Sequence, residues 1–205
     1  MGCYSAAMSK GRLEAFSDGV LAIIITIMVL EMKVPHGHEG ERITLEHLRP
    51  LMPVFLSYVL SFVYVGIYWN NHHHMLHAAK RVTGGVLWAN LHALFWLSLL
   101  PFATGWMGEN HFESVPAALY GAVLFMAAIA YLILQRTLIG ADGSASRVAS
   151  AVGKDWKGKM SLVGYAAGIG LAFVHPWMAV GMYALVALMW VVPDRRIERE
   201  LEGAA

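Results

Sequence analysis

Six long apolar stretches restrict what this chain can fold into more than any other feature of its sequence. They are 15 to 21 residues long, and roughly 20 residues of helix cross a lipid bilayer. A helix that is apolar on every side needs lipid or deep burial around it, which argues against a water-soluble bundle. The stretches are Phe16–Met32, Leu51–Trp69, Val86–Trp106, Ala117–Leu134, Met160–Val174 and Trp177–Val192.

The composition agrees with this interpretation and excludes other classes of protein. The chain is 58% hydrophobic and only 14% charged, unlike an ordinary soluble domain. We therefore expect an all-α membrane protein, with a single six-helix transmembrane domain over residues 1–205 and the lipid bilayer around it. The net charge of +1 is spread over the loops and predicts no nucleic-acid partner. A lone cysteine, Cys3, rules out an intrachain disulfide.

The segments between the stretches predict how the helices are joined. Only His175 and Pro176 separate the fifth stretch from the sixth, so the two stretches should form a tight helical hairpin. Both stretches are short, and we extend each of them by a few residues at its cytosolic end. Pro101 should kink or end the third helix. We expect loops over Asn70–Gly85 and Gly140–Lys159.

Basic residues predict the orientation of the helices. With the N-terminus in the cytosol, the outside loops hold three of the 15 Lys and Arg residues, namely Lys33, Arg42 and Arg49. This bias follows the positive-inside rule, so we expect both termini to be cytosolic.

The first stretch is the first functional candidate. Charged and polar side chains at its start, Arg12, Ser17 and Asp18 among them, lead directly into an apolar run from Gly19 to Leu30. Charge at the mouth of a membrane helix is costly unless it is paired or serves a pathway. One face of this helix carries bulky aliphatic side chains at i, i+4 and i+7; these are Ile23, Ile27 and Leu30.

Arg12, Phe16, Ser17 and Asp18 have the spacing Arg-x-x-x-Phe-Ser-Asp ahead of this helix. The motif resembles the signature of the transmembrane protein 175 family, potassium-permeable channels of prokaryotes and animal endolysosomes, and the likeness extends from Arg12 to about Pro193. It implies a potassium channel that needs no cofactor, in the plasma membrane of a prokaryote. It also implies a homotetramer, because one-repeat members assemble in fours around a pore lined by the first helix.

By the same resemblance, Ile23, Ile27 and Leu30 would form the narrowest part of the pore; in an arbitrary membrane helix they would be ordinary packing residues. A ring of such side chains opposes ion passage unless it widens enough to hold water, and it has no fixed acceptors. We therefore expect only a modest preference for potassium over sodium. Thr26 either offers a polar ring near these residues or bonds back to the carbonyl of residue 22.

The charged motif residues need partners on other helices. Arg12 and Asp18 are six residues apart, which does not bring their side chains together on one helix. We expect each to bond to neighbouring helices and so to fix the first helix in the bundle, which is a structural role. The end of the second helix also offers His72 and His74. The candidate partners that we select are Asn70, His73, His77, Asn90 and His92.

His73 and His77 also have the i, i+4 spacing that can ligate a metal from one helix face. No cysteine accompanies them, so we favour polar capping and interfacial packing, assign no metal site, and leave metal binding and proton sensing open. Asp18 has no second carboxylate at a matching depth, so we assign no catalytic residue and expect no enzyme.

Two other classes of function are weighed against the channel. A secondary transporter or proton-coupled cation exchanger usually has broken helices with polar groups at mid-membrane. Here the ionisable residues of the spans, such as Asp18 and Glu31, lie near their ends, which favours the channel. A membrane enzyme that uses the histidines ranks last, because no nucleophile or metal triad has a convincing spacing.

Overall fold

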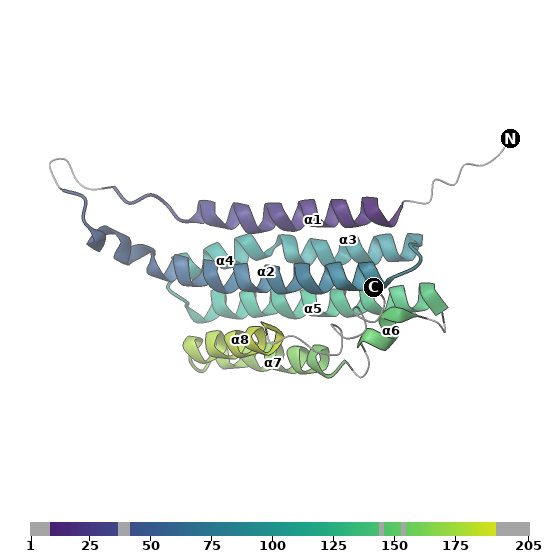
Figure 1. The fold of residues 1–205 in the computed structure, drawn as a ribbon. Helices are drawn as coiled ribbons and strands as arrows, with labels where there is room; N and C mark the ends of the chain where they lie inside the picture. The colour runs from purple at the N-terminus through teal and green to yellow at the C-terminus, as the bar shows by residue number, and fades with distance from the viewer. Residues whose placement is uncertain (1–8, 37–41, 144–145, 153–154, 192–205) are drawn as a thin grey trace.

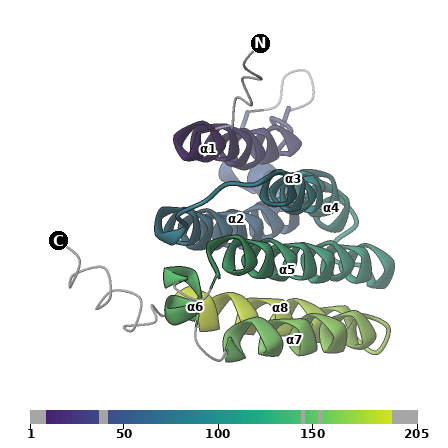
Figure 2. The ribbon, with the colours of Figure 1, turned by 90° about the vertical axis from the view of Figure 1, so that its right-hand side faces the viewer.

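The computed structural model describes residues 9–36, 42–143, 146–152 and 155–191, and all the regular structure in these ranges is helical. Most of the helices run side by side, with α1 at one edge of the bundle and α7 and α8 at the opposite edge (Figures 1 and 2). The α-helices are α1 (Lys10–Ile27), α2 (Met52–Ala78), α3 (Gly84–Ser98), α4 (Leu100–Glu109), α5 (Ser114–Asp142), α6 (Arg147–Val152), α7 (Trp156–Ala172) and α8 (Pro176–Val191), and the 3-10 helices are η1 (Met28–Glu31) and η2 (Leu45–Leu51).

Four helical segments are long and apolar enough to cross a membrane. They are Lys10–Glu31, Leu45–Ala78, Gly84–Glu109 and Ser114–Asp142, and they contain the first four predicted stretches almost entirely. The apolar helix α8 is shorter. With 17 and 16 residues, α7 and α8 each rise about 25 Å, against roughly 30 Å for a hydrocarbon core.

The third segment is broken where its proline predicts a break. Helix α3 ends at Ser98, and α4 begins at Leu100 with Pro101 in its first turn. A proline is tolerated there because the first N–H groups of a helix have no intrahelical acceptor. The predicted hairpin also forms, since α7 and α8 pack against each other across a short connection.

Two predicted loops were too long; of Asn70–Gly85, only residues 79–83 lie outside the helices. Helix α2 continues to Ala78, so Asn70 to Ala78 are helical instead of part of a loop. The predicted Gly140–Lys159 loop holds the end of α5, all of α6 and the first turn of α7. Hydropathy marks the part of a helix that lies in lipid, whereas backbone hydrogen bonding continues into its polar ends. Val192, the end of the sixth stretch, lies outside the described residues.

Tyrosines form the centre of the core. Tyr64, Tyr120 and Tyr183 are almost fully buried, and each hydroxyl has a hydrogen-bond partner, as burial demands. Tyr64 donates to the carbonyl of Tyr183 at 2.6 Å, and Tyr183 donates to the carbonyl of Ala117 at 3.1 Å. The hydroxyl of Tyr120 lies 3.0 Å from Ser61 Oγ. These bonds connect α2, α5 and α8.

Candidate functional site on the first helix

Helix α1 has two apolar faces, and only one of them is covered. The buried face packs against α2, α3 and α4 and comprises Leu13, Ser17, Leu21 and Ile24, continued by Met28 of η1. The other face has no cover in the single chain. The exposed fractions are 50% for Phe16, 63% for Ile23 and 45% for Ile27, and the face continues in η1 with Leu30, which is 74% exposed.

This uncovered face carries the three aliphatic residues that the sequence singles out. Their exposure shows that they are not core residues of the single chain. Thr26 lies beside them, and its hydroxyl donates to the carbonyl of Ala22 at 2.9 Å and to that of Ile23 at 3.1 Å. Its side chain is nevertheless exposed, so a lone pair of the oxygen stays available outside the helix.

Ser17 is held by a buried chain of polar side chains. The amide nitrogen of Asn90 on α3 donates to Ser17 Oγ at 2.9 Å. The Oδ1 atom of Asn90 lies 2.7 Å from Nε2 of His72 on α2. All three side chains are buried. The chain therefore joins α1, α2 and α3, and an amide such as Asn90 suits its centre because it both donates and accepts.

Asp18 is held by an aromatic side chain. The indole N–H of Trp69 on α2 donates to Asp18 Oδ1 at 3.0 Å. The Trp69 ring stacks on His73, which in turn stacks on His77, with centroids 6.3 Å and 6.2 Å apart. Lys10 Nζ donates to the carbonyl of His77 at 2.6 Å. The start of α1 is thus fastened to the end of α2.

The structure brings one of the five candidate partners, Asn90, into contact with the motif. His73 and His77 instead form the stack on Trp69, and His92 accepts a hydrogen bond from Trp96 at 3.0 Å. Asn70 is exposed. Arg12 is exposed, and within the described ranges its side chain makes no hydrogen bond or ion pair, although its backbone N–H donates to the carbonyl of Ser9 at 3.0 Å.

Trp69 is absent from the predicted partners. The sequence does contain a signal for it, since an indole N–H near a membrane boundary usually finds an acceptor. No group of three or more His, Cys, Asp or Glu side chains placed to hold a metal occurs in the part of the chain that the structure describes. The stacked pair of His73 and His77 is short of a third ligand there.

The C-terminal end of the first segment is also fastened. Lys33 Nζ lies 2.7 Å from Glu109 Oε1 at the end of α4. The hydrogen bond and the charge of Glu109 raise the pKa of Lys33. The first segment therefore has polar contacts near both of its ends and an uncovered apolar stripe between them.

The fold and the site together define an all-helical membrane protein. Comparison with known proteins shows which family of membrane proteins it belongs to. A family model described as endosomal/lysosomal potassium channel TMEM175 matches residues 12–101. The chain is 54% identical to a potassium channel of Chryseobacterium sp., over 95% of this chain and 99% of that protein. It is 32% identical to a potassium channel of Streptomyces collinus, over 88% of this chain and 91% of that one.

A solved structure agrees. The crystal structure of a lysosomal potassium-selective channel TMEM175 homolog from Chamaesiphon minutus matches with a TM-score of 0.76 and 29% identity, over 89% of this chain and 96% of that one. The chain belongs to the TMEM175 family. Its relatives are channels and not enzymes, and the resemblance carried by the motif is confirmed.

Proposed function

We propose that this protein is a potassium-permeable channel of a prokaryotic plasma membrane, formed by four copies of the chain around a pore that α1 lines. The observation that carries the proposal is the uncovered stripe of Ile23, Ile27 and Leu30 on a helix whose other face is packed. One chain cannot enclose a pore with one such helix, so assembly is part of the proposal. Six helices cross the membrane, with both termini in the cytosol.

In this arrangement the three aliphatic side chains form stacked rings that constrict the pore. Such a ring expels water when it is narrow and admits hydrated ions when it widens, which makes it a hydrophobic gate. The exposed Thr26 oxygen adds a polar ring between two of these layers, even while its proton is donated to the helix. Potassium is the permeating ion, and its preference over sodium is modest.

The motif residues position the gate without touching the ion. Ser17 and Asp18 bond to α3 and α2, so the first helix follows those two helices when they move. Gating is then a displacement of α1 by its neighbours. The names of the relatives favour this channel over a transporter or exchanger.

The test is passive potassium flux into proteoliposomes that hold the purified protein, with sodium and caesium for comparison. Ile23→Ala should change conductance or selectivity, because it removes the constricting side chain. Leu185→Ala on α8 is the matched control: Leu185 is 62% exposed and Ile23 is 63% exposed, but in the proposal Leu185 faces lipid and should leave the flux unchanged.

The outcomes separate the parts of the proposal. Equal effects of both substitutions would place the pore elsewhere. Flux that occurs only with an opposing proton or sodium gradient would replace the channel by an exchanger. Native mass spectrometry of the detergent-solubilised protein should give four times the 22.5 kDa chain, and a dimer or monomer would contradict the fourfold pore.

A further inference from the structure

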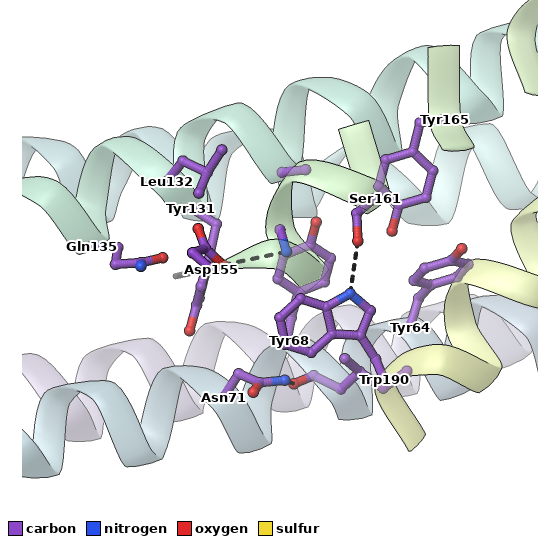
Figure 3. Close-up of a pocket in the computed structure, with 13 residues that line it drawn as sticks. Tyr64, Tyr68, Asn71, Tyr131, Leu132, Gln135, Asp155, Ser161, Tyr165 and Trp190 are labelled. Carbon is purple, nitrogen blue, oxygen red and sulfur yellow. Dashed lines mark hydrogen bonds between the residues drawn. The ribbon is translucent and has the colours of Figure 1, made fainter. Parts of the chain in front are cut away.

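A cavity with polar groups in its walls lies between α2, α5, α7 and α8. None of the residues that line it belongs to α1. Figure 3 shows the cavity with a carboxylate, amides and several aromatic side chains directed around it. Its volume is about 40 Å³, and one water needs about 10–15 Å³. Two or three heavy atoms therefore fit inside, which is enough for the ammonium end of an alkylamine but not for the whole of a longer one.

The walls of this cavity are mostly aromatic. Tyr68 and Tyr131 meet edge to face, with ring centroids 5.8 Å apart. Within the described ranges neither hydroxyl has a hydrogen-bond partner, in contrast to Tyr64, which donates to a backbone carbonyl. Trp190 completes this side, and its indole N–H donates to Ser161 Oγ at 2.8 Å, which fixes the ring (Figure 3). Aromatic faces and phenol oxygens are the surroundings that organic cations prefer.

The carboxylate of Asp155 lines the same cavity, and no cation among the described residues is paired with it. Asp155 is half-buried, and its Oδ1 accepts the N–H of Gly158 at 3.2 Å, which caps α7. Burial is the main influence on the pKa of Asp155 and raises it, against hydrogen bonds from Gly158 and Gln135 and the more distant charges of Lys159 and Arg136. Among the described residues no Lys, Arg or His makes an ion pair with it. A half-buried carboxylate of this kind gains from a positive charge brought beside it.

The chain itself shows that this aromatic wall attracts positive charge. The ammonium group of Lys157 lies 5.7 Å from the centroid of the Trp190 ring. Lys157 is not among the residues that line the cavity, whereas Trp190, Asp155, Tyr68 and Tyr131 are.

We propose that this cavity binds an alkylammonium group, with Asp155 as its counter-charge and Tyr68, Tyr131 and Trp190 as the aromatic surface around it. The group has two chemical sources, a free amine from the water phase or the ethanolamine headgroup of a phospholipid. In either case it joins the first turn of α7 and the end of α8 to α2 and α5. The site is separate from the exposed face of α1 and does not depend on the proposed pore.

The test uses the full chain in detergent and follows thermal unfolding with butylammonium chloride as the probe. Neutral butanol and equal concentrations of potassium chloride control for hydrophobic and ionic-strength effects. We expect a saturable rise in melting temperature with butylammonium alone, as for any ligand that binds only the folded state. Asp155→Asn should raise the half-saturating concentration at least tenfold. Asparagine still caps a helix and tolerates the left-handed backbone at this position, where φ is 44°.

Glu113→Gln is the matched control, because it also removes one carboxylate. Glu113 lies at the start of α5, whereas Gln135 at the cavity lies near the end of that helix. This variant should bind the probe as the wild type does. Trp190→Leu removes the ring but keeps Asp155, and it should weaken binding severalfold. It is the second test of the cavity if Asp155→Asn does not fold. An equal rise in melting temperature with butanol, or an unchanged half-saturating concentration in both cavity variants, would overturn the proposal.

A second arm identifies the source of the ammonium group. Native mass spectrometry of protein mixed with phosphatidylethanolamine or phosphatidylglycerol should show ethanolamine lipid that butylammonium displaces, if a headgroup occupies the cavity. If butylammonium binds and neither lipid competes, a free amine is the ligand. Absence of binding by butylammonium and by phosphatidylethanolamine would again overturn the proposal.

Discussion

The two edges of the bundle are built differently. At one edge α1 packs on one side only, is held by polar contacts near its ends, and leaves its other apolar face open. At the other edge α7 and α8 pack on each other and on α5 around the buried ring of Tyr183. In the proposed channel, this contrast separates the helix that lines the pore from the helices that support it.

The largest effect should come from the two faces of α1. Leu21 is 1% exposed and Ile23 is 63% exposed, two residues apart on the same helix. Leu21→Ala removes packed methyl groups from the core and should cost about 2–5 kcal/mol of unfolding free energy. Ile23→Ala should stay within about 0.5 kcal/mol, while it changes ion flux. Denaturant unfolding in detergent measures both, and equal losses would show that the open face is covered in the folded subunit.

The edge formed by α7 and α8, the tight edge, should be sensitive to added side-chain volume instead. A Cβ placed on Gly168 of α7 would collide with the Tyr183 ring, whereas one on Gly170 would meet nothing within 4 Å. Gly168→Leu should therefore destabilise by about 1–3 kcal/mol, as overpacking of a core does. Gly170→Leu adds the same side chain to the same helix and should be neutral or stabilising, because glycine is a poor helix former. A similar melting temperature for the two variants would contradict this packing.

The polar contacts of α1 should have a smaller effect. Asn90→Ala leaves the buried side chains of Ser17 and His72 without their shared partner, which should cost on the order of 1–2 kcal/mol. Asn70→Ala removes an exposed asparagine from α2 and should change little. Unfolding and potassium flux should be measured together, because displacement of α1 would also alter the flux. Equal effects of the two variants would remove the buried chain as the anchor of α1.

The sequence predicts the parts of this molecule that depend on local pattern. The first four apolar stretches mark the four long apolar segments, and Pro101 lies at the break between α3 and α4. The helix ends were less predictable, as with α2, which extends nine residues beyond Trp69 to Ala78. Polar side chains lower hydropathy without interrupting the backbone hydrogen bonds, so the loop over Asn70 was misassigned.

Contacts between helices were harder to predict than the helices themselves. Ser17 and Asn90 are 73 positions apart, and seven Asn and His side chains lay near the expected cytosolic end as possible partners. Which of them meets Ser17 depends on the rotation of each helix about its axis, and no local pattern fixes that rotation. The cavity beside Asp155 was missed for the same reason, because four helices contribute to its walls.

The smallest expected effect concerns Asp155 at the tight edge and depends on pH. Burial raises the pKa of Asp155 above its ordinary value of 3.8, so the folded chain holds this proton more tightly than the unfolded chain. The stability that this proton contributes is complete below about pH 3.8 and is lost as pH rises through the folded-state pKa. At neutral pH the wild type therefore carries the cost of a half-buried charge, and Asp155→Asn does not.

Without amine, Asp155→Asn should consequently melt slightly above the wild type at pH 7, and the difference should shrink as the pH approaches 3.8. Saturating butylammonium should reverse the order at pH 7, because the ammonium group compensates the carboxylate only in the wild type. Melting curves over this pH range, with and without butylammonium, measure both effects. A difference that stays constant with pH would mean that the carboxylate is solvated in the folded chain, and the tight edge would then hold no uncompensated charge for a ligand to neutralise.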